Sequence, residues 1–120
     1  MTEEEAREFG KKWLDAWNRH DLDEILSHYV DEIEFSSPFV VKLLNQEDDV
    51  IRGKDALRAY FSRALAAYPE LHFELHNVLA GATSVVVYYT SVNHQLAAEM
   101  MILDPNGRVS RVWAHYSSRN

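Results

Sequence analysis

Three side chains in this sequence are candidates for proton transfer: His94, Tyr116 and Ser37. A histidine titrates near neutral pH, so His94 could serve as an acid or a base, while Tyr116 or Ser37 orients a substrate by a hydrogen bond. Strand alternation places His94 on the same face as Leu96 and Ala98. His94 also lies near the start of a predicted strand, where an exposed histidine is the commoner arrangement. The residue types therefore allow acid–base chemistry without requiring it.

The segment HFELH, residues 72–76, has the ligand types of an iron site with two histidines and one carboxylate. In a strand, however, His72 and His76 would stand roughly 13 Å apart at about 3.3 Å per residue, which is too far for one metal ion. The sequence has no cysteine, which excludes disulfides and sulfur ligands. No GxSxG segment is present to position a serine nucleophile. We expect no metal and no cofactor.

Length and charge bound the class of protein. At 120 residues, of which 47% are hydrophobic, the chain is long enough for one domain, residues 1–120, with its own core. The net charge of −7 repels phosphate backbones, so we expect no nucleic acid partner. The acidic start MTEEEAREFG differs from a signal peptide, and no apolar run reaches the length of a membrane span. These features predict a soluble, cytoplasmic protein with no membrane partner.

Three amphipathic helices are predicted in the first part of the chain. Capping signals at Thr2–Glu5 and Asp21–Glu24 begin the first two helices, and a stripe that includes Trp13 and Trp17 marks the apolar side of the first. The segment 53–69 predicts a third helix that a proline ends. These helices would have to hold the candidate side chains against a sheet.

Alternating apolar residues predict the strands of that sheet. The segment 32–37 is a half-buried strand in which Phe35 and Ser37 share a face. The apolar segment 39–49 has no clean period and is a candidate lid. Four further strands are predicted at 71–80, 84–92, 94–104 and 108–118. Helices followed by a meander of strands predict an α+β domain whose sheet curls around the helices.

With this order of elements, WNRHDLDEILSHYVDEIEFSSPF, IRGKDALRAYF and DPNGRVSRVWAHYSS resemble the nuclear transport factor 2-like superfamily, close to its SnoaL-like branch. The resemblance runs from about Phe9 to the C-terminus. It implies a cystatin-like α+β fold: a cone-shaped barrel with three N-terminal helices packed on a strongly curved antiparallel or mixed sheet. It also implies a mostly apolar cavity inside the cone and dimerisation through the outer sheet face.

Members of this superfamily with known chemistry carry acidic residues in the cavity. Aligned through HDLDEIL and EFSSPF, the position of the ketosteroid isomerase base falls on Ser37, that of its tyrosine on Trp13, and that of its protonated acid on Leu96. The acid of the polyketide cyclases falls at or near Ala114. The resemblance thus implies that both sets of acids are absent, and it leaves open whether the protein is an enzyme.

These expectations define one pocket for a small apolar molecule. Trp17 and Phe35 would supply its walls, while Ser37, His94 and Tyr116 supply hydrogen bonds. The predicted lining is Trp13, Trp17, Phe35, Ser37, His94, Leu96, Ala98, Val112, Ala114 and Tyr116. The first hypothesis is a binding protein for a small hydrophobic ligand, without an assignable reaction. The alternatives are an isomerase, cyclase or hydrolase that uses His94 as acid or base, and a dimeric interaction module with a filled cavity.

The last predicted strands are apolar on both faces. A monomer would expose one of these faces to water as a single patch, which predicts a homodimer through the outward sheet face. Ala97, Met101, Trp113 and Val87 are expected near the centre of that interface.

Overall fold

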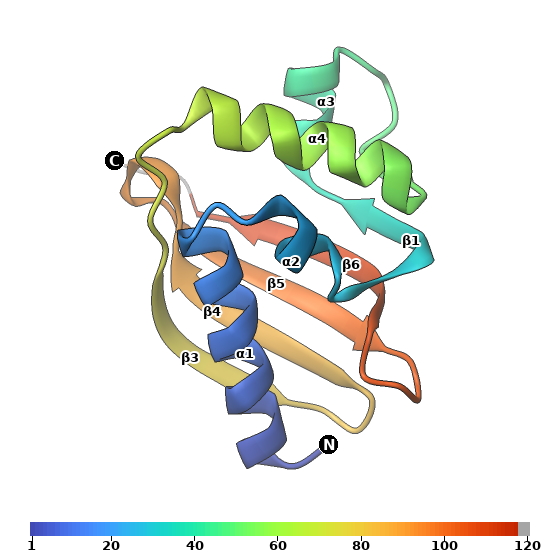
Figure 1. The fold of residues 1–120 in the computed structure, drawn as a ribbon, viewed down its shortest axis with the longest axis vertical. Coiled ribbons are helices and arrows are strands. Elements are labelled where there is room, and N and C mark those ends of the chain that lie inside the picture. Colours follow the sequence, from blue (N-terminus) through green and yellow to red (C-terminus); the bar gives the residue numbers. More distant parts are fainter. Residues whose placement is uncertain (118–120) are drawn as a thin grey trace.

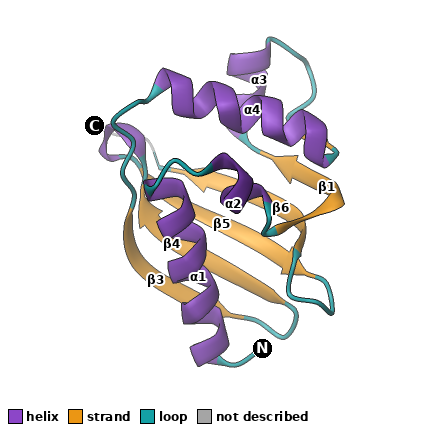
Figure 2. Ribbon diagram, viewed as in Figure 1, coloured by secondary structure: helices purple, strands orange, loops and turns teal. Residues whose placement is uncertain are grey.

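The computed structural model describes residues 1–117, which form one six-stranded mixed sheet with helices packed on it (Figures 1 and 2). The helices are α1 (Glu3–Asn18), α2 (Leu22–Leu26), α3 (Pro38–Leu44) and α4 (Lys54–Ala67), with a short 3-10 helix η1 (Val92–His94). The strands are β1 (Tyr29–Ser36), β2 (Val50–Arg52), β3 (Glu74–Ala80), β4 (Ser84–Thr90), β5 (Leu96–Leu103) and β6 (Val109–Tyr116). The predicted α+β class is confirmed, although the sheet is not closed into a barrel. Residue 118, the predicted end of the last strand, lies outside the described residues.

The sheet brings together strands that are far apart in the sequence. Its strand order is β2-β1-β6-β5-β4-β3. β1 and β6 are parallel neighbours, and the other neighbouring pairs are antiparallel. The long strands β4, β5 and β6 therefore lie at the centre and twist beneath the helices, as Figure 1 shows. Within residues 1–117, no helix combines the length and the apolar character needed to cross a membrane.

Helix α1 is held at its start by local chemistry and along its length by packing. The predicted capping box is confirmed: the Thr2 side chain accepts from the Glu5 backbone N–H at 3.0 Å, and the Glu5 carboxylate accepts from the Thr2 N–H at 2.9 Å. The helix packs on β3, and a side chain at Gly10 would place its Cβ 2.5 Å from a Val78 methyl group. Gly10 thus permits the close approach of α1 to the sheet.

Helix α3 was not predicted, since the segment that contains it was expected to be a loop. Ser37 is its N-cap and accepts a hydrogen bond from the Phe39 N–H at 3.3 Å, and Pro38 occupies the first helical turn. Proline is well tolerated there because it lacks a backbone N–H, and the N–H groups of the first helical turn have no hydrogen-bond partner within the helix. The helix ends at Asn45, which adopts a left-handed conformation with φ of 51°. A serine followed by proline before an apolar run was therefore a helix start.

The two faces of β5 were assigned the wrong way round. Alternate residues from Ala97 to Leu103 are buried under the helices, whereas Leu96 and Met100 are exposed on the outer face. Because both sets are apolar, the sequence showed that the residues alternate between two faces but not which face turns inward. The phase comes from pairing with β4, which aligns Ala97 with the buried Tyr89.

This correction also changes the residues predicted for the dimer interface. Ala97, Met101 and Val87 are buried on the inner face and cannot meet a partner. Trp113 lies on the outer face, where it pairs across the strands with the exposed Met100.

Candidate functional site

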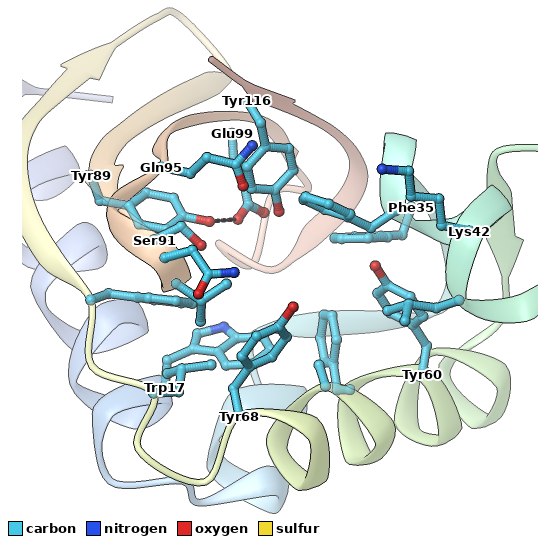
Figure 3. Close-up of a pocket in the computed structure, with 18 residues that line it drawn as sticks. Trp17, Phe35, Lys42, Tyr60, Tyr68, Tyr89, Ser91, Gln95, Glu99 and Tyr116 are labelled. Atoms are coloured by element: carbon cyan, nitrogen blue, oxygen red, sulfur yellow. Dashed lines mark hydrogen bonds between the residues drawn. The ribbon is translucent and has the colours of Figure 1, made fainter. Parts of the chain in front are cut away.

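A cavity of about 280 Å³ lies between the inner face of the sheet and the helices α1, α3 and α4. Its walls are mainly aromatic: Trp17 comes from α1, Phe35 from β1, Phe39 from α3, and Tyr60 and Phe61 from α4. Figure 3 shows the rings of Trp17, Phe35 and Tyr60 around a hollow, with the sheet on its opposite side. The part of segment 39–49 that forms α3 contributes to this lining, and its Lys42 is an exposed cation there.

Glu99 is the acidic group of this cavity and the only carboxylate among the described residues that line it. It projects from the inner face of β5 and is 4% exposed. The Tyr89 hydroxyl donates a hydrogen bond to Glu99 Oε2, drawn as a dashed line in Figure 3. Within the described chain, Glu99 Oε1 has no hydrogen-bond partner. One oxygen of the carboxyl group is thus held in place while the other is available to a ligand.

The environment of Glu99 favours its neutral form. Burial raises the pKa of the carboxyl group from its ordinary value of 4.5 to about 7, and the hydrogen bond from Tyr89 opposes part of this rise. A carboxyl group of this kind is present in both protonation states near neutral pH. It can therefore donate a proton to a bound molecule or accept one from it.

Four tyrosines of the described chain line the cavity with Glu99, and the pKa is raised for three of them, Tyr60, Tyr89 and Tyr116. Burial raises the pKa of Tyr89 and of Tyr116, and the nearby Glu99 carboxylate raises both further. Burial likewise raises the pKa of Tyr60 to about 12, against a hydrogen bond with Ser37. All three phenols consequently stay neutral at physiological pH, as hydrogen-bond donors rather than bases.

Trp17 contributes a second polar atom without a partner. Its side chain is 6% exposed, and its indole Nε1 is buried with no hydrogen-bond partner in residues 1–117. The ring packs edge-on against Phe61, with 4.7 Å between centroids. Figure 3 shows the indole nitrogen turned toward the hollow.

The structure brings together some of the predicted pocket residues and separates others. Trp17, Phe35 and Tyr116 line the cavity. Ser37 is 1% exposed and does not line the cavity; its hydroxyl accepts from the Phe39 N–H and caps α3.

Trp13, Val112 and Ala114 are buried beside the cavity but do not line it. Leu96 and Ala98 lie on the outer face of β5, so their predicted inward orientation is wrong. These positions follow from the phase of the sheet strands rather than from residue type.

His94 is exposed and lies outside the cavity, so its predicted inward orientation is also wrong. It belongs to the turn between β4 and β5, where His94 and Asn93 both have positive φ, 58° and 57°. This turn interrupts the strand alternation that was used to orient His94. The side chain borders a separate, open groove that Glu74 and the exposed His72 also line.

The acidic group at Glu99 was missed because the strand LAAEMMIL was considered only for its apolar residues. A single charged residue in a strand that is otherwise apolar on both faces was the available signal. Tyr60 belongs to the buried side of the amphipathic helix α4 and Tyr89 to the apolar strand β4, so residue type alone did not single them out. Tyr60 lies on α4 and Tyr89 on β4, so only the packing of α4 against the sheet brings both phenols to one cavity.

Comparison with known proteins assigns the fold to a family. The SnoaL-like domain matches residues 11–118, so the chain belongs to the SnoaL-like family. A SnoaL-like protein of unknown function from Burkholderia thailandensis is 43% identical, with 98% of each chain covered and a TM-score of 0.94. A search of curated proteins found no match.

Two more distant structures share the fold. The epoxide hydrolase/cyclase-like enzyme SalBIII, which has a role in pyran ring formation in the polyether salinomycin, is 21% identical over 96% of this chain and 92% of its own, with a TM-score of 0.76. A protein of unknown function with a cystatin-like fold from Methylobium petroleophilum is 15% identical over 100% of this chain and 80% of its own, with a TM-score of 0.77. The SnoaL-like and related proteins include isomerases, cyclases and hydrolases.

Proposed function

We propose that this protein is an acid–base enzyme that acts on a small, mostly apolar carbonyl compound, with Glu99 as the group that transfers the proton. The observation that carries the proposal is the free Oε1 of a buried carboxyl group inside an aromatic cavity. A pKa of about 7 suits this role, because a catalytic acid or base works best when its pKa lies near the working pH. The proposal moves the predicted acid or base from His94 to Glu99.

The cavity has few side chains that could exchange a proton near neutral pH, and this limits the type of reaction. Glu99 is the only carboxylate among the described lining residues, and the histidines lie outside the cavity. A proton that Glu99 takes from one carbon of the substrate would therefore return from Glu99 to another atom of the same substrate. This favours an isomerisation or an internal ring closure, in which the substrate keeps its composition.

The tyrosine hydroxyls would support such a step. Removing a proton next to a carbonyl group places negative charge on the carbonyl oxygen, and neutral hydroxyl donors in a buried site stabilise that charge. Tyr116 and Tyr60 line the same cavity and stay neutral because their pKa values are raised. The likeness in fold to SalBIII agrees with a site that accepts cyclic or cyclising compounds.

Exchange of carbon-bound hydrogen tests this function without knowledge of the natural substrate. Cyclohexanone, 1-decalone and a 3-ketosteroid would be incubated with the protein in D₂O, and exchange next to the carbonyl followed by NMR. The wild type should accelerate exchange of at least one ketone, and Glu99→Gln should reduce the acceleration by about a hundredfold or more. His94→Gln should match the wild type.

Bound ketones that exchange no faster than in buffer would contradict the enzyme. That result would instead support the first hypothesis of a ligand-binding protein without chemistry. Equal exchange by wild type and Glu99→Gln would show that Glu99 is not the acid or base.

A further inference from the structure

Two tryptophans one turn apart on α1 differ in their hydrogen bonds. Trp13 Nε1 donates to the Tyr29 hydroxyl at 2.9 Å in the packed core. Trp17 Nε1 is equally removed from solvent but has no partner in residues 1–117, and it faces the cavity. Most buried polar groups in proteins are hydrogen-bonded, so an exception that faces a cavity calls for an explanation.

The unpartnered atoms of the cavity lie on two different walls. Glu99 Oε1 projects from β5 in the sheet, and Trp17 Nε1 from α1 in the helical layer. The remaining lining between them is largely aromatic. A ligand that spans the cavity would thus meet a buried polar atom without a partner on each of these two walls, and aromatic side chains along much of the lining between them.

We propose that the substrate carries two oxygen functions at opposite ends of a compact apolar skeleton, one at Glu99 and one held by the Trp17 indole N–H. This inference rests on the proposed function for the reacting end and adds the chemistry of the other end. An indole N–H only donates, so the distant group must be an acceptor, such as a carbonyl or ether oxygen. Bicyclic diones and keto-ethers meet this description, and Trp17 is the specificity-determining residue.

The size of the cavity supports a compact substrate. A volume of about 280 Å³ accommodates a two-ring skeleton more readily than an extended chain. A ligand with one oxygen would leave either the carboxyl group or the indole N–H unpaired in a buried site. Sites built to hydrogen-bond a ligand reject analogues that lack the matching group.

Matched ligands on one skeleton test the proposal by binding alone. The probes are trans-1-decalone and three trans-decalin diones, with oxygens at positions 1,4, at 1,5 and at 2,6. At least one dione should bind about tenfold more tightly than the mono-ketone, as expected when a buried donor gains its partner. In Trp17→Phe, which keeps an aromatic wall but has no N–H, the dione and the mono-ketone should bind equally. Phe35→Leu, a control at another wall, should weaken both ligands and keep their ratio.

NMR of the indole N–H groups supplies a second measurement. It uses the wild-type protein, so no substitution can alter the stability of the sample. The chain has three tryptophans. The preferred dione should shift the Trp17 N–H signal downfield, in the direction expected on hydrogen bonding. The signals of Trp13, already bonded to Tyr29, and of Trp113, on the outer face, should stay in place.

Three results would overturn the proposal: no dione bound more tightly than the mono-ketone, a dione preference that survives in Trp17→Phe, or failure of all four probes to bind. Because the readout is binding, the inference can fail while hydrogen exchange by Glu99 succeeds. The reverse is also possible, since a dione preference without exchange would support the ligand class and contradict the enzyme.

Discussion

The space between α1 and the sheet consists of a filled part around Trp13 and a hollow part around Trp17. In the filled part, Trp13 is 1% exposed, stacks on Phe73 with 6.2 Å between centroids, and meets Tyr89 edge-on at 5.4 Å. Its N–H is bonded to Tyr29. In the hollow part, Trp17 and Glu99 each keep one buried polar atom without a partner in the described chain.

The difference shows how one apolar layer serves two purposes. Where side chains fill the space, polar atoms pair with one another and the residues contribute to stability. Where a cavity separates the sheet from the helices, the same residue types are left with unsatisfied atoms, which reduces stability and creates a site for a ligand. Trp13 thus contributes mainly to stability, whereas Trp17, four residues later, gives up part of that contribution to form a ligand site.

Truncation of the two tryptophans is the strongest test of this comparison. Trp13→Ala should lower the free energy of unfolding by about 4 kcal/mol, because it removes a fully packed ring and leaves a new cavity. Trp17→Ala should cost about 1 to 2 kcal/mol less, since one side of that ring already borders empty space. Urea denaturation measures both values. Equal losses would mean that the region around Trp17 is as well packed as the region around Trp13.

Neutralising Glu99 should sharpen the comparison through pH. Because the folded pKa of about 7 exceeds the ordinary 4.5, the folded state binds the proton more tightly than the unfolded state. The stability that this contributes is complete below pH 4.5 and is lost as the pH rises through 7, with a total of about 3 kcal/mol. Glutamine stays neutral and avoids this loss. Glu99→Gln should therefore match the wild type near pH 4 and be more stable by up to about 3 kcal/mol near pH 8.5.

Thermal and urea unfolding at both pH values would measure the effect of Glu99→Gln. The matched control is Glu74→Gln on the exposed part of β3, which should follow the wild type throughout. If the stability of the wild type relative to Glu99→Gln is the same at both pH values, burial does not raise the pKa of the Glu99 carboxyl group.

The outer sheet face gives the smallest expected effect on the fold. Met100 is 39% exposed there, opposite Trp113 on β6 and Val86 on β4. We expect this cross-strand row at the centre of a homodimer. It replaces Ala97, Met101 and Val87, which were predicted for the interface but are buried on the inner face. Met100→Glu should change the stability of the monomer by no more than about 0.5 kcal/mol while it dissociates the dimer. Sedimentation measures this, and a wild type that is monomeric at micromolar concentration would remove the dimer.

Much of the architecture was predictable from the sequence because it depends on local chemistry. The capping residues Thr2 and Asp21 begin their helices as expected, and both capping bonds are present. The tryptophan stripe predicted the buried face of α1, and Trp17 and Phe35 line the cavity found there. Helix periodicity and caps act over a few residues, so they can be read without the rest of the fold.

The sequence by itself thus determined an α+β domain with an aromatic helix on a sheet, and the family to which it belongs. Only the tertiary structure decided which face of β5 turns inward, because both faces are apolar and the left-handed residues before the strand reset the alternation. That single choice places Glu99 inside and Leu96 outside, and it leaves His94 away from the cavity. The raised pKa of Glu99 likewise arises from burial that strands and helices distant in sequence create together. The site is therefore a property of strand pairing, which no local pattern in the chain specifies.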